Sequence, residues 1–405
     1  MKSESSSMGV RTYSSAHSLV GISDVYLSTK RGSFVVPKQN AHSHLLLVLP
    51  LFVVLLLSCE ASEPRVVSLS ETKSLQQVGT IEIQENDNRF IGTIAGCDVK
   101  LNPFRLYIAD RKAERIVVVG DDGQIEGFVG QPGNGPGELR GPADVLVAGN
   151  RIVVLQSRLQ GFATFDTTGT YRATYHLAEG HRYSGMYSLS ADGEGGYIFP
   201  VTMNLETVQV SSDETAVARL NSAFEITETF GTFPSLYQEG EYVAQQRTLD
   251  VRNDSLAAVG YRLVPDVQLY NLTEEGIPKV SEVPLTHPAF QSPNREITRR
   301  LTQESQKAFY EALSNASVVG HTSLLENGVV VQSFANRTKA FFEKQGWPKS
   351  ERDHYAVLGT VNSQERLHLR LPGRILARDE KDRLYVLINH TPDKRRIGIY
   401  KVNWP

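Results

Sequence analysis

Cysteine is nearly absent from this chain, which has only Cys59 and Cys97 among its 405 residues. A framework of disulfides is therefore excluded as the main source of stability. An excess of charge is also absent, because 42 lysines and arginines almost balance 45 aspartates and glutamates. The formal net charge is −3, and no basic block follows the N-terminal region. Because nucleic-acid binding needs a basic face, we expect no nucleic-acid partner.

The motifs of several common chemistries are missing too. The chain has no Gly-x-Ser-x-Gly elbow, no His-Glu-x-x-His pair and no Gly-Lys-Ser/Thr turn that would open a nucleotide-binding helix. His176 and His181 are close in sequence, but no metal-ligand pattern surrounds them. We therefore expect no catalytic residue, no metal ligand and no cofactor.

The N-terminal region contains an apolar run that is too short to cross a bilayer as a helix, which needs roughly 20 residues. This run, Leu45–Leu57, reads LLLVLPLFVVLLL and follows Lys38. It fits the apolar region of a secretory signal, so we predict that residues 1–58 are a targeting segment. An uncleaved hydrophobic anchor is the alternative. Because the polar stretch before the run is long for a signal, we expect the true start to lie near Val35 or Val36.

The end of that run carries a second pattern. Leu56-Leu57-Ser58-Cys59 resembles the lipobox of bacterial lipoprotein signal peptides. The resemblance implies that Cys59 carries a diacylglycerol, becomes the first residue of the mature protein and is acylated, for example with palmitate. It implies a membrane partner through this anchor and a place in the bacterial cell envelope, at the outer membrane. The polar residues 59–74 are expected to form a flexible tether.

A polar turn followed by a short apolar strand occurs six times in the rest of the chain. The copies are residues 104–108, 150–155, 196–199, 255–259, 328–331 and 382–387. The first three lie about 45 residues apart, which is the spacing of propeller blades. A small repeated sheet cannot bury its faces alone, so the copies must pack against each other, and a closed ring is the usual solution.

The order of strands within the repeat predicts how the ring closes. In residues 99–177 each copy is followed by further strands and an Asp-Gly or Thr-Gly turn, but the last copy lacks an outer strand. Val78–Ile83 alternates in hydrophobicity and precedes the first copy, so it is the candidate for that missing strand. The sequence therefore predicts an all-β, six-bladed propeller over residues 75–405, closed by an N-terminal strand. An open pair of β-sandwich sheets is the alternative.

Two stretches interrupt the repeat in its later part. Residues 294–315 have the spacing of an amphipathic helix, and residues 338–353 carry several aromatic side chains before Pro348. We expect short helical insertions here, which either cap the core or form a lid or docking element at one end of the ring.

The stretch between the first two units is rich in glycine. Gly135-Pro136-Gly137-Glu138 is followed by an apolar residue and then by Gly141-Pro142. This resembles the linker of NHL-repeat propellers and, more closely, the turn of bacterial six-bladed β-propeller lipoproteins. The resemblance extends over about residues 75–403, although blades three to five lack the motif.

The resemblance and the ring suggest two functions. The first is a monomeric binding module that holds a protein, peptide or glycan at the propeller rim or channel mouth, without catalysis. The alternative is a metal-dependent enzyme, similar to propeller lactonases or lyases, with a calcium ion on the axis. Asp98, Asn102 and Asp144 are the residues that would reach such a site, whereas Cys97 is expected to be a small buried hydrophobe.

Overall fold

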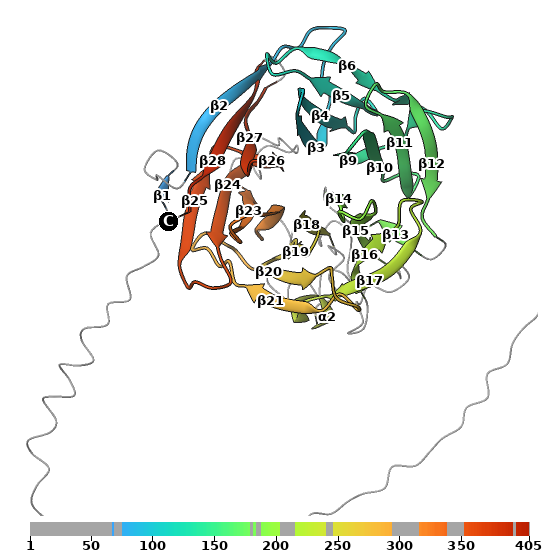
Figure 1. Ribbon diagram of the computed structural model, residues 1–405. Helices are drawn as coiled ribbons and strands as arrows, with labels where there is room; N and C mark the ends of the chain where they lie inside the picture. Colours follow the sequence, from blue (N-terminus) through green and yellow to red (C-terminus); the bar gives the residue numbers. More distant parts are fainter. Residues whose placement is uncertain are drawn as a thin grey trace, which may run out of the picture. The chain divides into compact units, whose positions relative to one another are not determined.

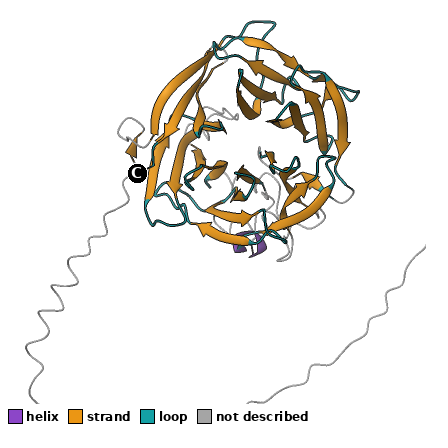
Figure 2. Ribbon diagram, viewed as in Figure 1, coloured by secondary structure: helices purple, strands orange, loops and turns teal. Residues whose placement is uncertain are grey.

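The computed structural model contains a ring of six small antiparallel sheets (Figure 1). It describes residues 67–68, 75–178, 181–183, 188–202, 215–239, 246–293, 316–337, 352–391 and 394–404. Strands make up nearly all of the regular structure, and α2 (Ser235–Glu239) is a short helix between the third and fourth sheets (Figure 2). The predicted all-β propeller is therefore confirmed. None of the helices in the described part is long and apolar enough to span a membrane.

Each sheet is one blade, and its strands follow one another from the axis outwards. Blades 1 and 2 consist of β3 (Ile94–Leu101), β4 (Phe104–Asp110), β5 (Arg115–Val119) and β6 (Ile125–Val129), then β9 (Pro142–Ala148), β10 (Arg151–Gln156), β11 (Gly161–Asp166) and β12 (Tyr171–His176). Blade 3 contains β14 (Ser190–Ala191), β15 (Tyr197–Thr202), β16 (Thr215–Leu220) and β17 (Ile226–Thr232), with β13 (Arg182–Tyr183) also on β15.

The later blades repeat this order. Blade 4 consists of β18 (Arg247–Arg252), β19 (Leu256–Tyr261), β20 (Val264–Asn271) and β21 (Lys279–Val283). Blade 5 consists of β22 (Val318–Leu324), β23 (Val330–Arg337), β24 (Arg352–Gly359) and β25 (Arg366–Leu371), with the short β1 (Val67–Ser68) parallel to β25. Blade 6 consists of β26 (Arg374–Arg378), β27 (Arg383–Thr391), β28 (Lys394–Val402) and β2 (Leu75–Ile83).

The ring closes through the predicted N-terminal strand. β2 pairs antiparallel with β28, from Leu75 opposite Val402 to Ile83 opposite Arg395. β2 is thus the outer strand of a blade whose other strands come from the C-terminus (Figure 1). This pairing confirms the expected closure. It excludes the open β-sandwich, because it joins β2, which directly precedes blade 1 in the chain, to the C-terminal strand β28.

The six repeated turn-strand copies become the second strand of each blade rather than the innermost one. They correspond to β4, β10, β15, β19, β23 and β27. The turn in front of each copy is the hairpin that follows the innermost strand. Turn residues such as Gly149 and Asp382, with φ of 61° and 59°, have the left-handed conformation that such a tight hairpin needs. Aspartates in these turns, for example Asp192 and Asp379, accept hydrogen bonds from nearby backbone amides.

The hydrophobic core lies between the blades, not within one central mass. Six buried clusters occur in the described part, and each joins two neighbouring blades. The cluster between blades 6 and 1, for example, includes Ile81 of β2, Ile94 of β3 and Ile397 of β28. No blade buries its own apolar faces, so the blades depend on the closed ring for their stability.

The interface between blades 3 and 4 contains a fully buried arginine as well as apolar side chains. Arg247 begins β18, and its Nε donates to the carbonyl of Ala216 at 3.0 Å. Its Nη2 donates to the carbonyls of Ala216 and Val201 on blade 3. The guanidinium also lies 4.7 Å from the ring centroid of Phe233. These contacts solvate the buried charge with backbone oxygens and an aromatic face.

The glycine-rich linker forms a compact turn between blades 1 and 2. β7 (Gln131–Pro132) and β8 (Glu138–Leu139) pair parallel within it. The Glu138 carboxylate accepts a hydrogen bond of 2.7 Å from the Gly135 amide, and such bonds lower the pKa of Glu138. The side chain of Leu139 is fully buried between the two blades. The first predicted insertion, residues 294–315, lies outside the described residues. So does most of the second, residues 338–353, of which only the last two residues are described, at the start of β24.

Candidate functional site

Polar and charged side chains lie on the innermost strands, where the sequence pattern is least regular. Asp98 is on β3, Asp144 on β9, Asp250 on β18, His321 on β22 and Arg378 on β26. These five blades thus each contribute an ionisable group near the axis. We call the end of the ring where the innermost strands begin the entry end, and the other the exit end.

Two of these carboxylates connect neighbouring blades. Asp98 accepts hydrogen bonds from the amide of Val99 at 2.8 Å and from the amide of Val147, on blade 2, at 2.7 Å. Asp144 repeats the arrangement. It accepts hydrogen bonds of 2.9 Å from the amide of Val145 and from the amide of Leu189, which lies beside β14 of blade 3. The carboxylates therefore act as links between innermost strands, because each oxygen takes a backbone donor from a different blade.

Burial raises the pKa of both groups. The pKa of Asp144 rises to about 7 through burial, and the charge of Asp98 raises it further, although the amides of Leu189 and Val145 oppose the rise. The pKa of Asp98 rises to about 6 through burial, against hydrogen bonds from Val147 and Val99 and the nearby charge of Arg378. Asp98 is half-buried whereas Asp144 is buried, which fits the smaller change for Asp98.

Asp144→Asn is expected to weaken the pH dependence of stability. The folded pKa of about 7 lies above the ordinary value of 3.8, so the contribution of Asp144 is complete below about pH 4 and is lost as the pH rises to 7. The full loss corresponds to about 4 kcal/mol, of which about 2–3 kcal/mol falls between pH 5 and pH 8. Urea unfolding at pH 5 and pH 8 measures it. Asp166→Asn is the control, because the pKa of Asp166 is lowered to about 2, outside this window. An unchanged pH dependence in Asp144→Asn would contradict the assignment.

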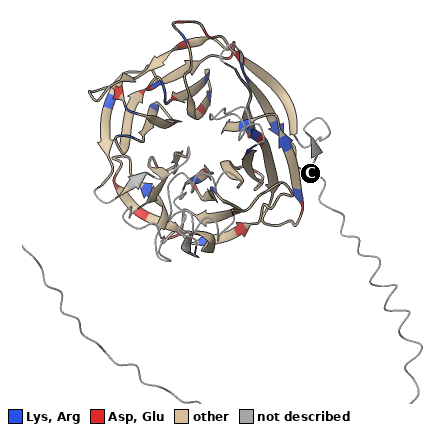
Figure 3. Cartoon of the chain, turned by 180° about the vertical axis from the view of Figure 1, so that it is seen from behind, with Lys and Arg blue, Asp and Glu red and all other residues tan. Residues whose placement is uncertain are grey.

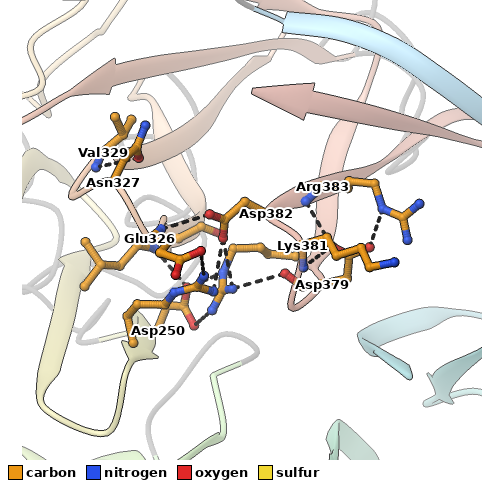
Figure 4. Close-up of polar contacts among 12 residues, drawn as sticks. Asp250, Glu326, Asn327, Val329, Asp379, Lys381, Asp382 and Arg383 are labelled. Carbon is orange, nitrogen blue, oxygen red and sulfur yellow. Dashed lines mark hydrogen bonds and ion pairs between the residues drawn. The ribbon is translucent and has the colours of Figure 1, made fainter. Parts of the chain in front are cut away.

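An ion pair connects two blades that are not neighbours. Arg378 of blade 6 donates from Nε to Asp250 Oδ2 of blade 4 at 2.8 Å and from Nη2 to Oδ1 at 3.1 Å (Figure 4). Asp250 Oδ2 also accepts the amide of Leu324, on the intervening blade 5, at 2.9 Å. The attraction of Asp250 raises the pKa of Arg378, although burial acts in the opposite direction. This bidentate pair therefore holds three blades together at the exit end.

Further charges extend this pair towards solvent. Arg252 contacts Asp382 at 3.1 Å, and Asp382 accepts the amide of Glu326 at 2.9 Å (Figure 4). Arg383 contacts Asp379, which also accepts from the Tyr385 hydroxyl. The aspartates are thus engaged by cations or amides of the chain itself.

The residues expected at an axial calcium site are only partly brought together. Asp98 and Asp144 lie on adjacent innermost strands, but Asn102 is exposed in the turn between β3 and β4. Across the described ranges, no three His, Cys, Asp or Glu side chains are grouped so that they would hold a metal ion. Cys97 is buried, and burial raises the pKa of its thiol. The predicted lipidation residue Cys59 lies outside the described residues.

The sequence interpretation missed four arginines at the entry end. Arg262 follows β19, Arg337 ends β23, Arg352 begins β24 and Arg374 begins β26. They are scattered over more than a hundred positions in sequence. The only signal was that Arg337 directly precedes one of the predicted insertions, residues 338–353, and that Arg352 lies near the end of it.

Solved structures that are similar to this chain come from several bacteria. A member of the duf4221 family from Bacteroides vulgatus has a TM-score of 0.63 and 11% identity, and covers 81% of this chain and 98% of its own. A protein from Bacteroides fragilis has a TM-score of 0.57 and 12% identity, over 84% of this chain and 98% of its own. A gluconolactonase from Xanthomonas campestris reaches a TM-score of 0.45 at 11% identity, over 76% and 88%. At identities this low the two Bacteroides structures support the fold alone, and the gluconolactonase is too distant to support any argument.

No curated protein matches this chain. A family model, DUF5128, described as "6-bladed beta-propeller", also matches this chain. It spans residues 65–352, from just before β1 to the start of β24. This extent is more than half of the chain, and together with the six blades it places the chain in that family of six-bladed β-propellers.

Proposed function

We propose that this protein is a binding module of the bacterial cell envelope, which holds a protein, peptide or glycan partner at one end of its ring and catalyses no reaction. Support comes first from the closed ring, because a scaffold joined at both ends keeps the loops of several blades in fixed positions. A fixed set of loops suits recognition, since little conformational freedom is lost when the partner binds.

The observation that carries this proposal is the state of the axial acids. Asp98 and Asp144 each accept two backbone amides, and Asp250 is held by Arg378 in a bidentate pair. A general base or metal ligand needs lone pairs that point at the reacting group. Each carboxylate oxygen of Asp98 and Asp144 already accepts one donor of the chain, and an arginine occupies the role that a cation would have beside Asp250.

Calcium and zinc are therefore expected to leave the thermal midpoint unchanged within about 1 °C. A ligand that binds the native state raises this midpoint, so the measurement reports on a site without knowledge of any substrate. The purified chain would be heated with 1–5 mM of either ion (roughly the range that saturates weak sites), with magnesium at the same ionic strength as control. A saturable rise of several degrees would overturn the binding-module proposal in favour of the metal-dependent enzyme.

We further propose that the ring is a monomer attached to the outer membrane through a lipid on Cys59. Support comes first from the lipobox-like residues that end at Cys59. It comes also from β1, whose Val67 and Ser68 lie opposite Leu369 and Arg370 of blade 5. Val67 is only eight positions after Cys59, a span of at most about 28 Å when extended. Such a tether would hold the outer edge of blade 5 close to the bilayer. Cys59→Ser is expected to move the protein to the soluble fraction, and its retention in membranes would contradict this proposal.

A further inference from the structure

The chain leaves blade 4 through a segment that lies against blade 5 and that we call the strap, residues 284–293. Its contacts follow the strands of blade 5 from the outermost to the innermost. At its start, the carbonyl of Pro284 accepts a hydrogen bond of 2.6 Å from Arg366 Nε on β25. Near its end, Gln291 and Ser317, which lies just before β22, exchange two hydrogen bonds of 2.8 Å. The strap is therefore fixed to blade 5 at both ends.

Alternate side chains in the first half of the strap point into the interface between blades 4 and 5. Leu285 and His287 are buried, whereas Pro284, Thr286 and Pro288 are exposed. Leu285 packs in the apolar cluster that joins the two blades. His287 is only 2% exposed and occupies the next inward position. A titratable ring is thus enclosed at a position that would suit an apolar side chain.

Rings from three strands of blade 5 surround His287. Its ring centroid lies 5.2 Å from that of Phe334 on β23, 5.1 Å from that of Tyr355 on β24 and 5.0 Å from that of His368 on β25. His368 is also buried, and its Nε2 lies 3.0 Å from the carbonyl oxygen of Thr286 in the strap. Because a carbonyl oxygen only accepts, His368 is the donor. The two imidazoles therefore connect the strap to the outermost strand of the blade.

The hydrogen bonds of His287 determine where its proton lies. Nδ1 accepts the amide of Ala289 at 2.9 Å, so this nitrogen carries no proton and the neutral ring holds its proton on Nε2. Nε2 is buried and has no hydrogen-bond partner among the described residues. A second proton would have to bind Nδ1, where it would oppose the Ala289 donor, and it would place a charge in the interface. The docked strap therefore requires the neutral form of His287.

The surroundings of the two imidazoles offer no compensation for such a charge. In the described part of the chain, neither ring has an acidic side chain as a hydrogen-bond or ion-pair partner. The strap itself carries no Lys, Arg, Asp or Glu, although such residues are spread around the ring (Figure 3). The titratable or charged groups of the elements packed against the strap are Tyr355, Arg366, the ion pair of Asp353 with Arg370, and Asp266 of β20, which accepts the Leu285 amide.

Burial keeps both imidazoles neutral while the strap is docked. It lowers the pKa of His287 to about 4, and the charge of His368 lowers it further. It also lowers the pKa of His368, against the hydrogen bond with Thr286. Since the docked value for His287 lies below the ordinary 6.5, the contribution of its neutral ring is complete above about pH 6.5 and is lost as the pH falls towards 4.

We propose that the strap is an acid-released latch, which detaches from blade 5 in mild acid while the ring stays closed. Closure of the ring depends on the pairing of β2 with β28 in blade 6, which the strap does not contact. Release would uncover Phe334, which is 3% exposed beneath His287 and Phe290. This inference goes beyond the proposed binding function and does not depend on it, since it concerns the connection between two blades and not the axial acids.

The test is hydrogen–deuterium exchange of the full-length protein at pH 7 and pH 5, corrected for the intrinsic rate at each pH. Exchange of the strap amides is expected to rise about 20-fold at pH 5, which is the factor that follows when the pKa of His287 returns from 4 to 6.5 on release. The amides of β4 and β10 are expected to keep their protection. Absence of a rise in the strap, or an equal rise in β4 and β10, would overturn the inference, because release would then be missing or global.

His287→Phe tests the assignment to this ring. Phenylalanine fits an apolar position among aromatic rings but does not titrate, so the rise at pH 5 is expected to fall below about fivefold. His176→Phe is the matched control, because His176 is exposed on β12 of blade 2, and it is expected to keep the full rise. If His287→Phe does not fold, His368→Gln replaces it, since glutamine can still donate to Thr286 without titrating, and the same reduction is expected.

A full rise in the variant that folds, or an equal reduction in His176→Phe, would contradict the assignment to His287 and His368. Neither result bears on the binding module, whose own test is the response of the thermal midpoint to calcium and zinc. A rise of that midpoint would in turn leave the latch standing, so the two proposals fail separately.

Discussion

Ile81→Asp is expected to unfold the ring or to reduce its free energy of unfolding by at least about 4 kcal/mol. Ile81 is 3% exposed on β2 and packs in the cluster that joins blade 6 to blade 1. The substitution removes buried apolar surface and places a carboxylate without a counter-charge among isoleucines, valines and leucines. Because domains are stable by only about 5–15 kcal/mol, one such change at the closure has a large effect. Urea unfolding followed by circular dichroism measures it.

Glu82→Gln provides the control on the same strand. Glu82 points to the exposed side of β2, and its carboxylate lies 3.7 Å from Arg396, with exposed fractions of 55% and 51%. Exposed ion pairs contribute less than about 1 kcal/mol, so this variant is expected to remain near wild-type stability. If Ile81→Asp were as stable as Glu82→Gln, the N-terminal strand would not be needed to hold the ring closed.

Arg247→Met is expected to be the most harmful substitution of an arginine, with a loss of about 3–5 kcal/mol. The methionine fills part of the volume but cannot donate, so the carbonyls of Val201 and Ala216 lose the donors that satisfy them between blades 3 and 4. The contact with Phe233 also loses its charge. Arg247→Lys is expected to recover only part of the loss, because an ammonium group cannot reproduce the guanidinium fork.

The comparison for this prediction is Arg370→Met. Arg370 is 62% exposed on β25, and it contacts an Asp353 that is also exposed, at 2.8 Å. Its loss is expected to change stability by less than about 1 kcal/mol. Chemical unfolding of both variants in parallel gives the difference. Equal stabilities would mean that the buried guanidinium contributes no more than a surface ion pair.

The parts of the fold that the sequence predicts are those with continuous apolar strands. β10 and β27 have buried residues on both faces, because each lies between strands of its own blade and between two neighbouring blades. A run such as Arg151–Leu155 is therefore easy to recognise. The closing strand β2 was predictable for a related reason. Its apolar and polar residues alternate, and the last repeat lacks an outer strand.

The innermost strands were not predictable in the same way. Their axial residues, including Asp98, Asp144 and His321, interrupt the apolar pattern, because polar side chains tolerate the axis while apolar ones pack between blades. The partners of these residues depend on the ring itself. Arg378 and Asp250 are 128 positions apart and meet only once blades 4, 5 and 6 are assembled. Arg247 likewise shows no signal in sequence, since its partners are backbone carbonyls of another blade.

The β2–β28 pairing has a consequence for biosynthesis. β2 is made among the first strands and β28 is the last, so the ribosome must finish the chain before the two can meet. Until then the apolar surfaces that pack between blades 6 and 1 stay exposed, and the nascent protein is an open arc of blades. Shortening the C-terminus by a single strand would leave the first-made segment with no place to dock.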